Sequence, residues 1–482
     1  MKKEESFIKQ ILQLATGAAV NLIIGVLTTP IITRLVDPTE YGQLSLFNTY
    51  SSIALMIFTL GLDQTFVRYY YVEKEKKYQK KLLDFCFCIP IILTAIGAVV
   101  ILIFNATNPG FLEFDDVVVW CFIANVFILI LNRFGMLELR LQYKTSLYSA
   151  MNILHKALYV VIVIPLVVFL KRQYLYILII ATLVSVLVSA TISIISERYF
   201  WFERVRGYNL SVSRKELIKF GFPLMISSSV FLLFQATDKI CIKHFGTYSD
   251  VGVFSSAQSL MTVFSIIQST FNTLWAPKAI DHYESDPDDR FFYQKMNQII
   301  TVLMFVFGAC VLLGKDVFVM LLGEKYREAS TIIPFLMFNP IMYTISETTV
   351  TGLAITKHTT SQVIITGVSA VVNLIGNIVL IPIFGSKGAA VSTGLSYIVF
   401  FTMRTLFSNH YFPIDFKLKR LYILTAVFAI GGWYHMYHSF DIVIVGIFIV
   451  TIGLICGLYR DTIRGIIEAG KLKLVALRKG KK

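Results

Sequence analysis

The stretches Ile91–Phe104, IILTAIGAVVILIF, and Tyr159–Leu170, YVVIVIPLVVFL, contain no charged residue. Each lies within a longer apolar segment of about 20 residues, the length that an α-helix needs to cross a bilayer. Of the 482 residues, 56% are hydrophobic and 15% are charged, and the mean hydropathy is +0.69. Soluble proteins have roughly 45–50% apolar and about 25% charged residues. The sequence therefore predicts an all-α polytopic membrane protein and excludes a soluble enzyme, a secreted disulfide scaffold and a disordered chain.

Fourteen segments have this apolar character, and we expect each to be a transmembrane helix because a backbone in lipid must satisfy its own hydrogen bonds. The predicted helices are 10–34, 42–64, 82–104, 116–136, 147–170, 174–196, 218–242, 251–275, 294–314, 330–353, 361–383, 388–409, 419–437 and 441–459. The loops between them are short, so we expect no soluble domain on either side of the membrane.

The basic residues indicate how the helices are oriented. The formal net charge is +14, and loops rich in Lys and Arg stay in the cytoplasm. If the N-terminus is inside, most of the 44 Lys and Arg residues fall in cytoplasmic segments. We therefore expect both termini in the cytoplasm and an even number of helices. The charge is a topology signal, and no nucleic-acid partner is expected.

An internal repeat divides the predicted helices into two halves. Glu40-Tyr41-Gly42 and Asp250-Val251-Gly252 lie 210 residues apart, and Asn48 matches Gln258 at the same offset. Six helices separate the copies, so the halves have the same orientation and are expected to enclose a central cavity. We predict two parallel six-helix lobes, at residues 1–200 and 210–410. Helices 13 and 14 and a basic cytoplasmic tail form an appendix at 411–482.

Polar stripes on two predicted helices support a hydrated interior. The first stripe has spacings of four and three residues, which places its members on one helix face: Gln258, Thr262, Ser265, Ser269 and Asn272. The helix 361–383 carries a second stripe: Thr366, Ser369, Asn373 and Asn377. The alternative interpretation is that these side chains only join neighbouring helices by hydrogen bonds.

Ionisable residues inside the spans are costly, about 2.5–3.5 kcal/mol each on insertion scales, and are therefore candidate functional residues. Lys156 lies about nine residues into its helix and shares a face with Asn152. Its alternative role is a structural ion pair with a carboxylate such as Glu347. Asp238 and Lys239 lie toward the outer end of their helix, where a local charge pair is the alternative.

Three further charged residues lie near the ends of spans. Arg133 and Arg404 are close to inner ends and Arg34 is at an outer end, so snorkelling to the interface is a sufficient explanation for them. The carboxylates Asp63, Asp238 and Glu347 are the candidates for binding a coupling cation.

No catalytic motif is present. The sequence lacks the P-loop pattern G-x-x-x-x-G-K-[ST] as well as H-E-x-x-H and G-x-S-x-G. The six cysteines lie in apolar segments and form neither a disulfide framework nor a zinc ligand set. We therefore expect no enzyme activity, no metal site and no cofactor. Energy would come from an H⁺ or Na⁺ gradient, the membrane potential or the removal of product.

Three motifs together resemble those of a known family. They are Gly61-Leu62-Asp63 with Arg68-Tyr69-Tyr70, Asp238-Lys239-Ile240 with the segment 245–257, and the segment 377–390, NIVLIPIFGSKGAA. The chain is similar to the polysaccharide transporter branch, the Wzx-type flippases, of the multidrug/oligosaccharidyl-lipid/polysaccharide exporter superfamily. It departs from the family pattern at Phe254, where a tyrosine is usual.

This resemblance implies that the protein moves a polyprenyl-pyrophosphate-linked oligosaccharide, a capsule or O-antigen repeat unit, to the outer leaflet of a bacterial inner (plasma) membrane. Other polysaccharide-assembly membrane proteins are expected partners. A pyrophosphate-sugar headgroup needs a wet, cationic path, while its lipid tail stays in the bilayer. Lys156, with Arg34 or Lys239, would bind the pyrophosphate. The predicted sugar contacts are Asn152, Gln258, Asn272 and Asn373.

Two transporters of the same superfamily are the alternatives. A drug/cation antiporter typically has a carboxylate in its first helix, and the segment Ile11–Ile32 has none. A flippase for the lipid precursor of peptidoglycan is harder to separate by sequence. A membrane-bound polymerase or ligase would need a large external loop, and the outer loops near 105–115 and 315–329 are short.

Overall fold

The computed structural model describes residues 20, 23–108, 114–170, 174–203, 205, 207, 208, 210–356, 358, 360–465, 467 and 468. Within these residues the regular structure is helical and contains no strand. Contacts divide the chain into two compact units, Met1–Ala236 and Thr237–Lys482. The fold class, an all-α polytopic membrane protein, is confirmed. The division into lobes 1–200 and 210–410 with an appendix 411–482 stays a prediction.

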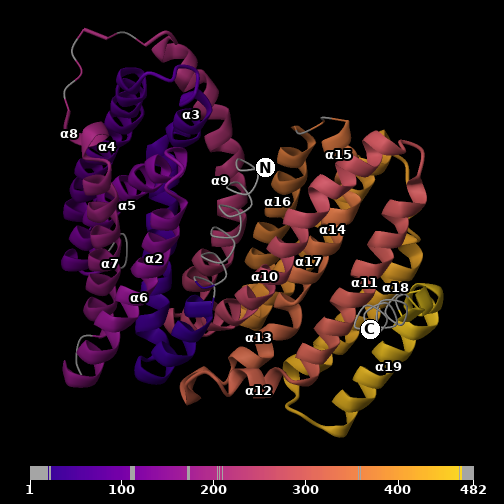
Figure 1. The fold of residues 1–482 in the computed structure, drawn as a ribbon. Coiled ribbons are helices and arrows are strands. Elements are labelled where there is room, and N and C mark those ends of the chain that lie inside the picture. The colour runs from indigo at the N-terminus through magenta and orange to yellow at the C-terminus, as the bar shows by residue number, and fades with distance from the viewer. Residues whose placement is uncertain are drawn as a thin grey trace, which may run out of the picture. The chain divides into compact units, whose positions relative to one another are not determined.

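The first unit is built around α5, which packs against α2 and α7, while α6 packs on α7 (Figure 1). Its helices are Ile23–Leu35, α2 (Pro38–Thr59), α3 (Leu62–Tyr69), α4 (Lys76–Thr107), α5 (Asp116–Leu141), α6 (Thr145–Leu170), α7 (Tyr174–Ser196), α8 (Arg198–Phe202) and α9 (Arg214–Phe245). The last turns of α9, from Thr237 onward, belong to the second unit.

The second unit is built around α17, which packs against α13, α14 and α16. Its elements are α10 (Tyr248–Ser285), α11 (Arg290–Leu313), α12 (Lys315–Val319), the 3₁₀ turn η1 (Glu324–Tyr326), α13 (Ala329–Leu336), α14 (Phe338–Thr349), α15 (Thr351–Ile355), α16 (Thr360–Phe384), α17 (Ser386–Tyr411), α18 (Leu418–Tyr437) and α19 (Ile442–Leu458). The helices α18 and α19 pack against each other and against α11.

Nine helices in the described part of the chain are long and apolar enough to span a membrane, or up to eleven if two bent pairs each count as one span. Every predicted range overlaps a helix, but the predicted count of fourteen is not confirmed. The described first helix, Ile23–Leu35, and α19 are short, at 10–17 residues. Residues 10–19, 21 and 22 of the first predicted helix lie outside the described residues.

The predicted repeat agrees with where two helices begin. The helix α2 begins at Pro38 and α10 begins at Tyr248, positions related by the offset that also relates Gly42 to Gly252. At the start of α10, Thr247 and Asp250 form a reciprocal capping box, which satisfies backbone N–H groups that have no partner inside the helix.

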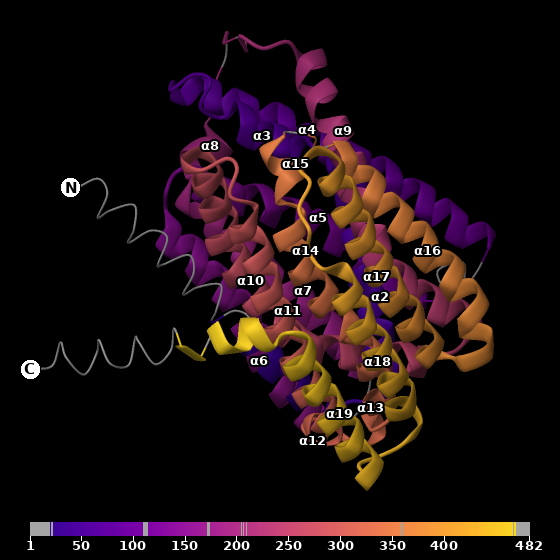
Figure 2. The ribbon, with the colours of Figure 1, turned by 90° about the vertical axis from the view of Figure 1, so that its right-hand side faces the viewer.

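The motif at residues 377–390 is a tight helical hairpin. Gly385 ends α16 with φ +61°, and α16 and α17 then run side by side (Figure 2). A Cβ added to Gly388 would come 2.3 Å from the carbonyl oxygen of Leu380, and one added to Gly376 would come 2.4 Å from Ser392 Oγ. Small residues therefore let the two helices approach closely, as membrane helices often do.

The motif Gly61-Leu62-Asp63 is a break between two helices. Leu60 and Gly61 have φ of 47° and 68°, and α2 and α3 are bent by 55° across them. A Cβ added to Gly61 would come 2.2 Å from the carbonyl oxygen of Gly221 in α9. Glycine is required here both for the left-handed backbone and for the close approach of α9.

Candidate functional site

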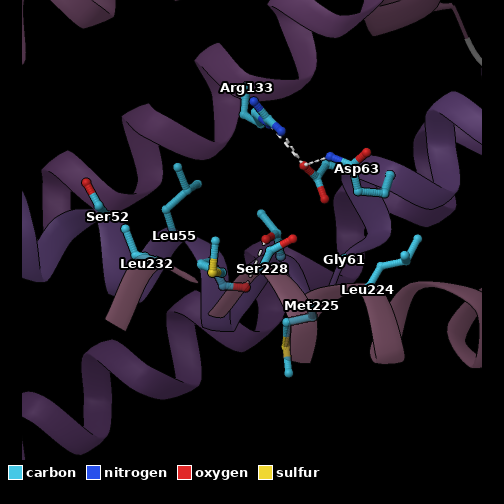
Figure 3. Close-up of a pocket in the computed structure, with 12 residues that line it drawn as sticks. Ser52, Leu55, Gly61, Asp63, Arg133, Leu224, Met225, Ser228 and Leu232 are labelled. Atoms are coloured by element: carbon cyan, nitrogen blue, oxygen red, sulfur yellow. Dashed lines mark hydrogen bonds and ion pairs between the residues drawn. The ribbon is translucent and has the colours of Figure 1, made fainter. Parts of the chain in front are cut away.

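A cavity of about 250 Å³ lies within the first unit, lined by α2, the break before α3, α5 and α9 (Figure 3). The residues from α2 have the three- and four-residue spacing of one helix face: Ser52, Leu55, Met56 and Thr59. Those from α9 are Leu224, Met225, Ser228 and Leu232. Gly61, Asp63, Gln64 and Arg133 complete the lining, so the charged groups are gathered at one end.

Asp63 and Arg133 form an ion pair at this end of the cavity. Arg133 Nη2 and Nε donate to the same carboxylate oxygen, Asp63 Oδ2, at 2.6 and 3.0 Å. Gln64 Nε2 donates to that oxygen at 3.1 Å. The side chain of Asp63 is 10% exposed and that of Arg133 is 44% exposed. The sequence suggested separate roles for the two residues, and the structure brings them together.

Lys156 lies against the backbone of the helix Ile23–Leu35. A Cβ added to Gly25 would come 2.7 Å from Lys156 Nζ, so the ammonium occupies space that only glycine leaves open. Asn152, one turn earlier in α6, donates through Nδ2 to the carbonyl oxygen of Tyr148 at 3.1 Å. Arg34 is exposed, and Lys156 and Asn152 are half-buried. None of these three described residues lines the cavity around Asp63.

Asp238 is the centre of a polar cluster in the second unit. Its Oδ1 accepts from Asn373 Nδ2 at 3.0 Å and from Asn377 Nδ2 at 2.8 Å. Its Oδ2 accepts from Thr393 Oγ1 at 2.6 Å. Asp238 is 3% exposed and both asparagines are fully buried, whereas Lys239 is half-buried. The predicted stripe of α16 therefore turns inward to a carboxylate.

The oxygens of the two asparagines make this cluster unusual. Asn377 Oδ1 is buried and accepts no hydrogen bond from the described residues, and Asn373 Oδ1 accepts from Asn377 Nδ2 at 3.2 Å. A buried polar atom without a partner costs about 1–3 kcal/mol. The carboxylate, two amide oxygens and a hydroxyl are the ligand types that a hard cation prefers. The described residues contain no group of three or more His, Cys, Asp or Glu that could hold a metal ion.

Glu347 lies in a second buried cluster of the same unit. Arg404 Nη1 donates to Glu347 Oε1 at 2.7 Å and to Ser346 Oγ at 2.8 Å. Arg404 Nη2 donates to Gln362 Oε1 at 3.4 Å, and the guanidinium lies over the rings of Phe400 and Tyr343. The carboxylate of Glu347 is therefore paired with Arg404, whose side chain is only 9% exposed and is held by protein groups.

The stripe of α10 remains more accessible than that of α16. Gln258 and Asn272 are half-buried, and Thr262 and Ser269 are exposed. Thr262 Oγ1 donates to the carbonyl oxygen of Ser259 at 2.6 Å, within its own helix. The helix bends by 41° between Phe264 and Ile267. The side chain of Ser265 lies outside the described part of the structure.

The sequence analysis missed two buried carboxylates, Glu138 and Glu197. Glu138, near the end of α5, accepts from Tyr70 Oη at 2.7 Å and from Gln142 Nε2 at 2.8 Å. Nearby, Lys144 Nζ lies 2.5 Å from Glu197 Oε1. For Glu138 the available signal was a glutamate within the apolar run MLELRL at 136–141.

Comparison with known proteins places the chain in a family. Residues 7–278, more than half of the chain, match the family described as polysaccharide biosynthesis protein. An uncharacterized membrane protein of Methanocaldococcus jannaschii is 23% identical over 222 residues, which are 45% of this chain and 44% of that protein. The chain thus matches less than half the length of this relative.

Two kinds of solved structure share the fold. A lipid II flippase MurJ in an inward closed conformation is similar with a TM-score of 0.69 and 13% identity, over 94% of this chain and 100% of that one. An inward-facing multidrug resistance MATE transporter of the MOP superfamily is similar with a TM-score of 0.56 and 15% identity, over 82% of this chain and 94% of that one.

Proposed function

The chain belongs to the polysaccharide biosynthesis protein family, and we propose that it is a flippase for a polyprenyl-pyrophosphate-linked oligosaccharide. In this proposal a capsule or O-antigen repeat unit passes from the cytoplasmic to the outer leaflet by alternating access. The protein would lie in a bacterial inner membrane with both termini in the cytoplasm. Other polysaccharide-assembly membrane proteins would supply and consume the substrate.

The position of Lys156 is the observation that carries this proposal. An ammonium within a span of high hydropathy is costly, and Gly25 leaves space for it beside the helix backbone. A cation held there suits a pyrophosphate, to which lysine donates charge-assisted hydrogen bonds. Arg34 and Lys239 would bind the same pyrophosphate at other stages of its transport. Asn152, Gln258 and Asn272, which are half-buried, would meet the sugars.

Asp238 is the coupling site in this proposal. Its buried carboxylate, with Asn373 and Asn377, offers oxygens to Na⁺ or a place for H⁺. Asn373 then serves the coupling ion rather than the sugar, because its side chain is fully buried. Asp63 and Glu347 are each held by an arginine, and we do not assign them this role.

A deletion strain tests the proposed substrate. It should accumulate lipid-linked oligosaccharide in the cytoplasmic leaflet and lose the surface glycan, and Lys156→Ala should fail to restore it. Arg140→Gln, an exposed residue at the end of α5, is the control and should restore it. Loss of surface glycan without accumulation of the precursor would contradict flipping, and full activity of Lys156→Ala would remove that residue from the path.

The coupling site has a separate test on purified protein. The unfolding temperature of the wild type should be higher in NaCl than in choline chloride at equal ionic strength, because an ion that binds only the folded state stabilises it. The difference should vanish in Asp238→Asn. Equal unfolding of the wild type in both salts would exclude Na⁺, and a pH-dependent transport rate that Asp238→Asn abolishes would then indicate H⁺.

A flippase for the peptidoglycan lipid precursor is the second candidate function, since the MurJ structure matches along 94% of this chain. The test is complementation of a strain depleted of its lipid II flippase. Growth would favour this candidate over the capsule or O-antigen substrate. A drug/cation antiporter is less consistent with a lysine inside the first unit, which would repel a cationic drug.

A further inference from the structure

The guanidinium of Arg133 is only partly used by the ion pair. Its Nε and Nη2 donate to Asp63 Oδ2, and among the described residues no acceptor binds Nη1. Its side chain is 44% exposed and lines the cavity. Figure 3 shows the guanidinium pointing toward Asp63, with Leu55 and Ser52 of α2 further away among the lining residues. The edge of the guanidinium that carries Nη1 is therefore open to a ligand.

The remaining cavity walls carry no other charge. Besides Asp63 and Arg133, the lining is apolar or carries a hydroxyl or an amide group. Thr59 Oγ1 donates to the carbonyl oxygen of Met56 at 3.1 Å, so it is occupied by its own helix. An anion that enters the cavity would thus meet one cation, and its only charged competitor in the lining would be the carboxylate of Asp63.

The cavity is a built site because α9 is fixed against the break between α2 and α3. Thr65 Oγ1 donates to the carbonyl oxygen of Leu217 at 3.1 Å. A Cβ added to Gly221 would come 2.6 Å from Thr65 Oγ1 and 2.9 Å from the carbonyl oxygen of Gly61. These contacts hold Leu224 and Ser228 of α9 opposite the residues of α2.

The volume suits a headgroup fragment. About 250 Å³ corresponds to roughly eight water molecules at about 30 Å³ each. A phosphate or pyrophosphate fits such a space, but an oligosaccharide does not. The open edge of a guanidinium binds phosphate oxygens in a bidentate manner, which a lysine cannot do.

We propose that this cavity is a phosphate subsite for the headgroup of a lipid, with Arg133 as the binding residue and Asp63 as its counter-ion. The inference rests on the proposed function and extends it to a further cation besides Lys156, Arg34 and Lys239. In the predicted orientation the break after α2 lies toward the cytoplasm, so this subsite would receive the headgroup from the inner leaflet. Asp63 holds Arg133 while the site is empty and weakens phosphate binding by repulsion.

Two substitutions at the pair should change binding in opposite directions. Arg133→Gln removes the cation and should weaken binding of polyprenyl pyrophosphate at least about tenfold. Asp63→Asn keeps an acceptor for Nε but removes the negative charge, so binding should become about fivefold tighter. Binding is measured by native mass spectrometry in a neutral detergent, with stepwise addition of the lipid. Arg140→Gln should bind as the wild type does.

A purely structural pair gives a different result, because either substitution would then disrupt the unit and lower binding. Equal losses in both variants, or unchanged binding in Arg133→Gln, would overturn the proposal. Arg133→Lys keeps the charge and should bind between the wild type and Arg133→Gln, and thermal unfolding of each variant identifies one that fails to fold. If Arg133→Gln does not fold, lipid binding is compared instead between Asp63→Asn and the double variant Asp63→Asn/Arg133→Lys. The lysine should then weaken binding relative to Asp63→Asn alone.

Two further ligands distinguish the source of the phosphate. Inorganic pyrophosphate alone should bind weakly, and phosphatidylglycerol should not compete with polyprenyl pyrophosphate. Tight binding of inorganic pyrophosphate without binding of the lipid would assign the cavity to a free phosphate and overturn the lipid subsite. The measurement does not depend on transport, so opposite effects of the two substitutions would stand even if the deletion strain accumulated no precursor.

Discussion

Two arginine–carboxylate pairs of similar length lie in the two units of the molecule, and their surroundings differ. Arg133 lies 2.6 Å from Asp63 with 44% of its side chain exposed. Arg404 lies 2.7 Å from Glu347, and both side chains are nearly covered, at 9% and 11% exposure. The first pair faces a cavity, whereas the second is enclosed by Ser346, aromatic rings and Gln362.

The difference shows that an ion pair within a span is not by itself evidence of a function. The enclosed pair is held by protein groups on all sides, although Arg404 Nε has no acceptor among the described residues, and breaking the pair would leave a buried charge. The open pair satisfies only part of its arginine, and solvent or a ligand can reach the remainder. Exposure of the guanidinium, more than the distance to the carboxylate, separates the candidate binding site from a structural contact.

The largest effect is expected at the enclosed pair. Arg404→Gln leaves the carboxylate of Glu347 buried without its partner, which should lower the free energy of unfolding by about 3–5 kcal/mol. Reversible unfolding in mixed micelles measures this loss. A loss as small as that of Arg133→Gln would mean that the two pairs do not differ as their exposures indicate.

The next effect concerns the contact that supports the open pair. Gly221→Ala places a Cβ 2.6 Å from Thr65 Oγ1, and we expect a loss of about 1–3 kcal/mol from this overpacking. Gly367→Ala is the matched control, because nothing lies within 4 Å of a Cβ at that position of α16. Equal stability of the two variants would show that α9 is not held closely at Gly61.

A double substitution should recover most of the stability lost at the enclosed pair. Glu347→Leu/Arg404→Met replaces both charges with apolar groups, so no unpaired charge remains, and its unfolding free energy should lie within about 2 kcal/mol of the wild-type value. A double variant as unstable as Arg404→Gln would instead assign the stability to the contacts with Ser346 and Gln362.

The smallest effect is expected at the open pair itself. Arg133→Gln should lower the unfolding free energy by about 1 kcal/mol: Asp63 is as buried as Glu347, but Gln64 still donates to it and solvent can replace the half-exposed guanidinium. The same micelle measurement tests it, with Arg140→Gln as the control. A large loss would place Arg133 with Arg404 among the structural arginines and leave the cavity without its binding residue.

The positions of the helices could be predicted from the sequence, but their pairings could not. Apolar runs such as Tyr159–Leu170 show helices because bilayer thickness sets their length. Asp63, by contrast, lies 70 residues from Arg133 in the chain, and Asp238 lies 135 and 155 residues from Asn373 and Thr393. No local pattern encodes such contacts.

The predicted polar stripes show the same limit. The stripes of α10 and α16 have similar periodicity, yet Asn373 is fully buried at a carboxylate while Thr262 is exposed. Periodicity identifies the face on which residues lie, but the packing of neighbouring helices determines whether that face is exposed to solvent. The predicted helix 42–64 likewise crosses a 55° bend at Gly61, where the neighbour that comes close is Gly221, far away in the chain.

The position of Lys156 Nζ beside Gly25 has a consequence for the interpretation of genetic variants. A methyl group at position 25 would fill the place of the ammonium and push the charge elsewhere, although no ionisable residue had been altered. Gly25→Ala should therefore produce the same defect as a change at Lys156. A mutational scan that scores alanine as harmless in a helix would overlook this electrostatic lesion.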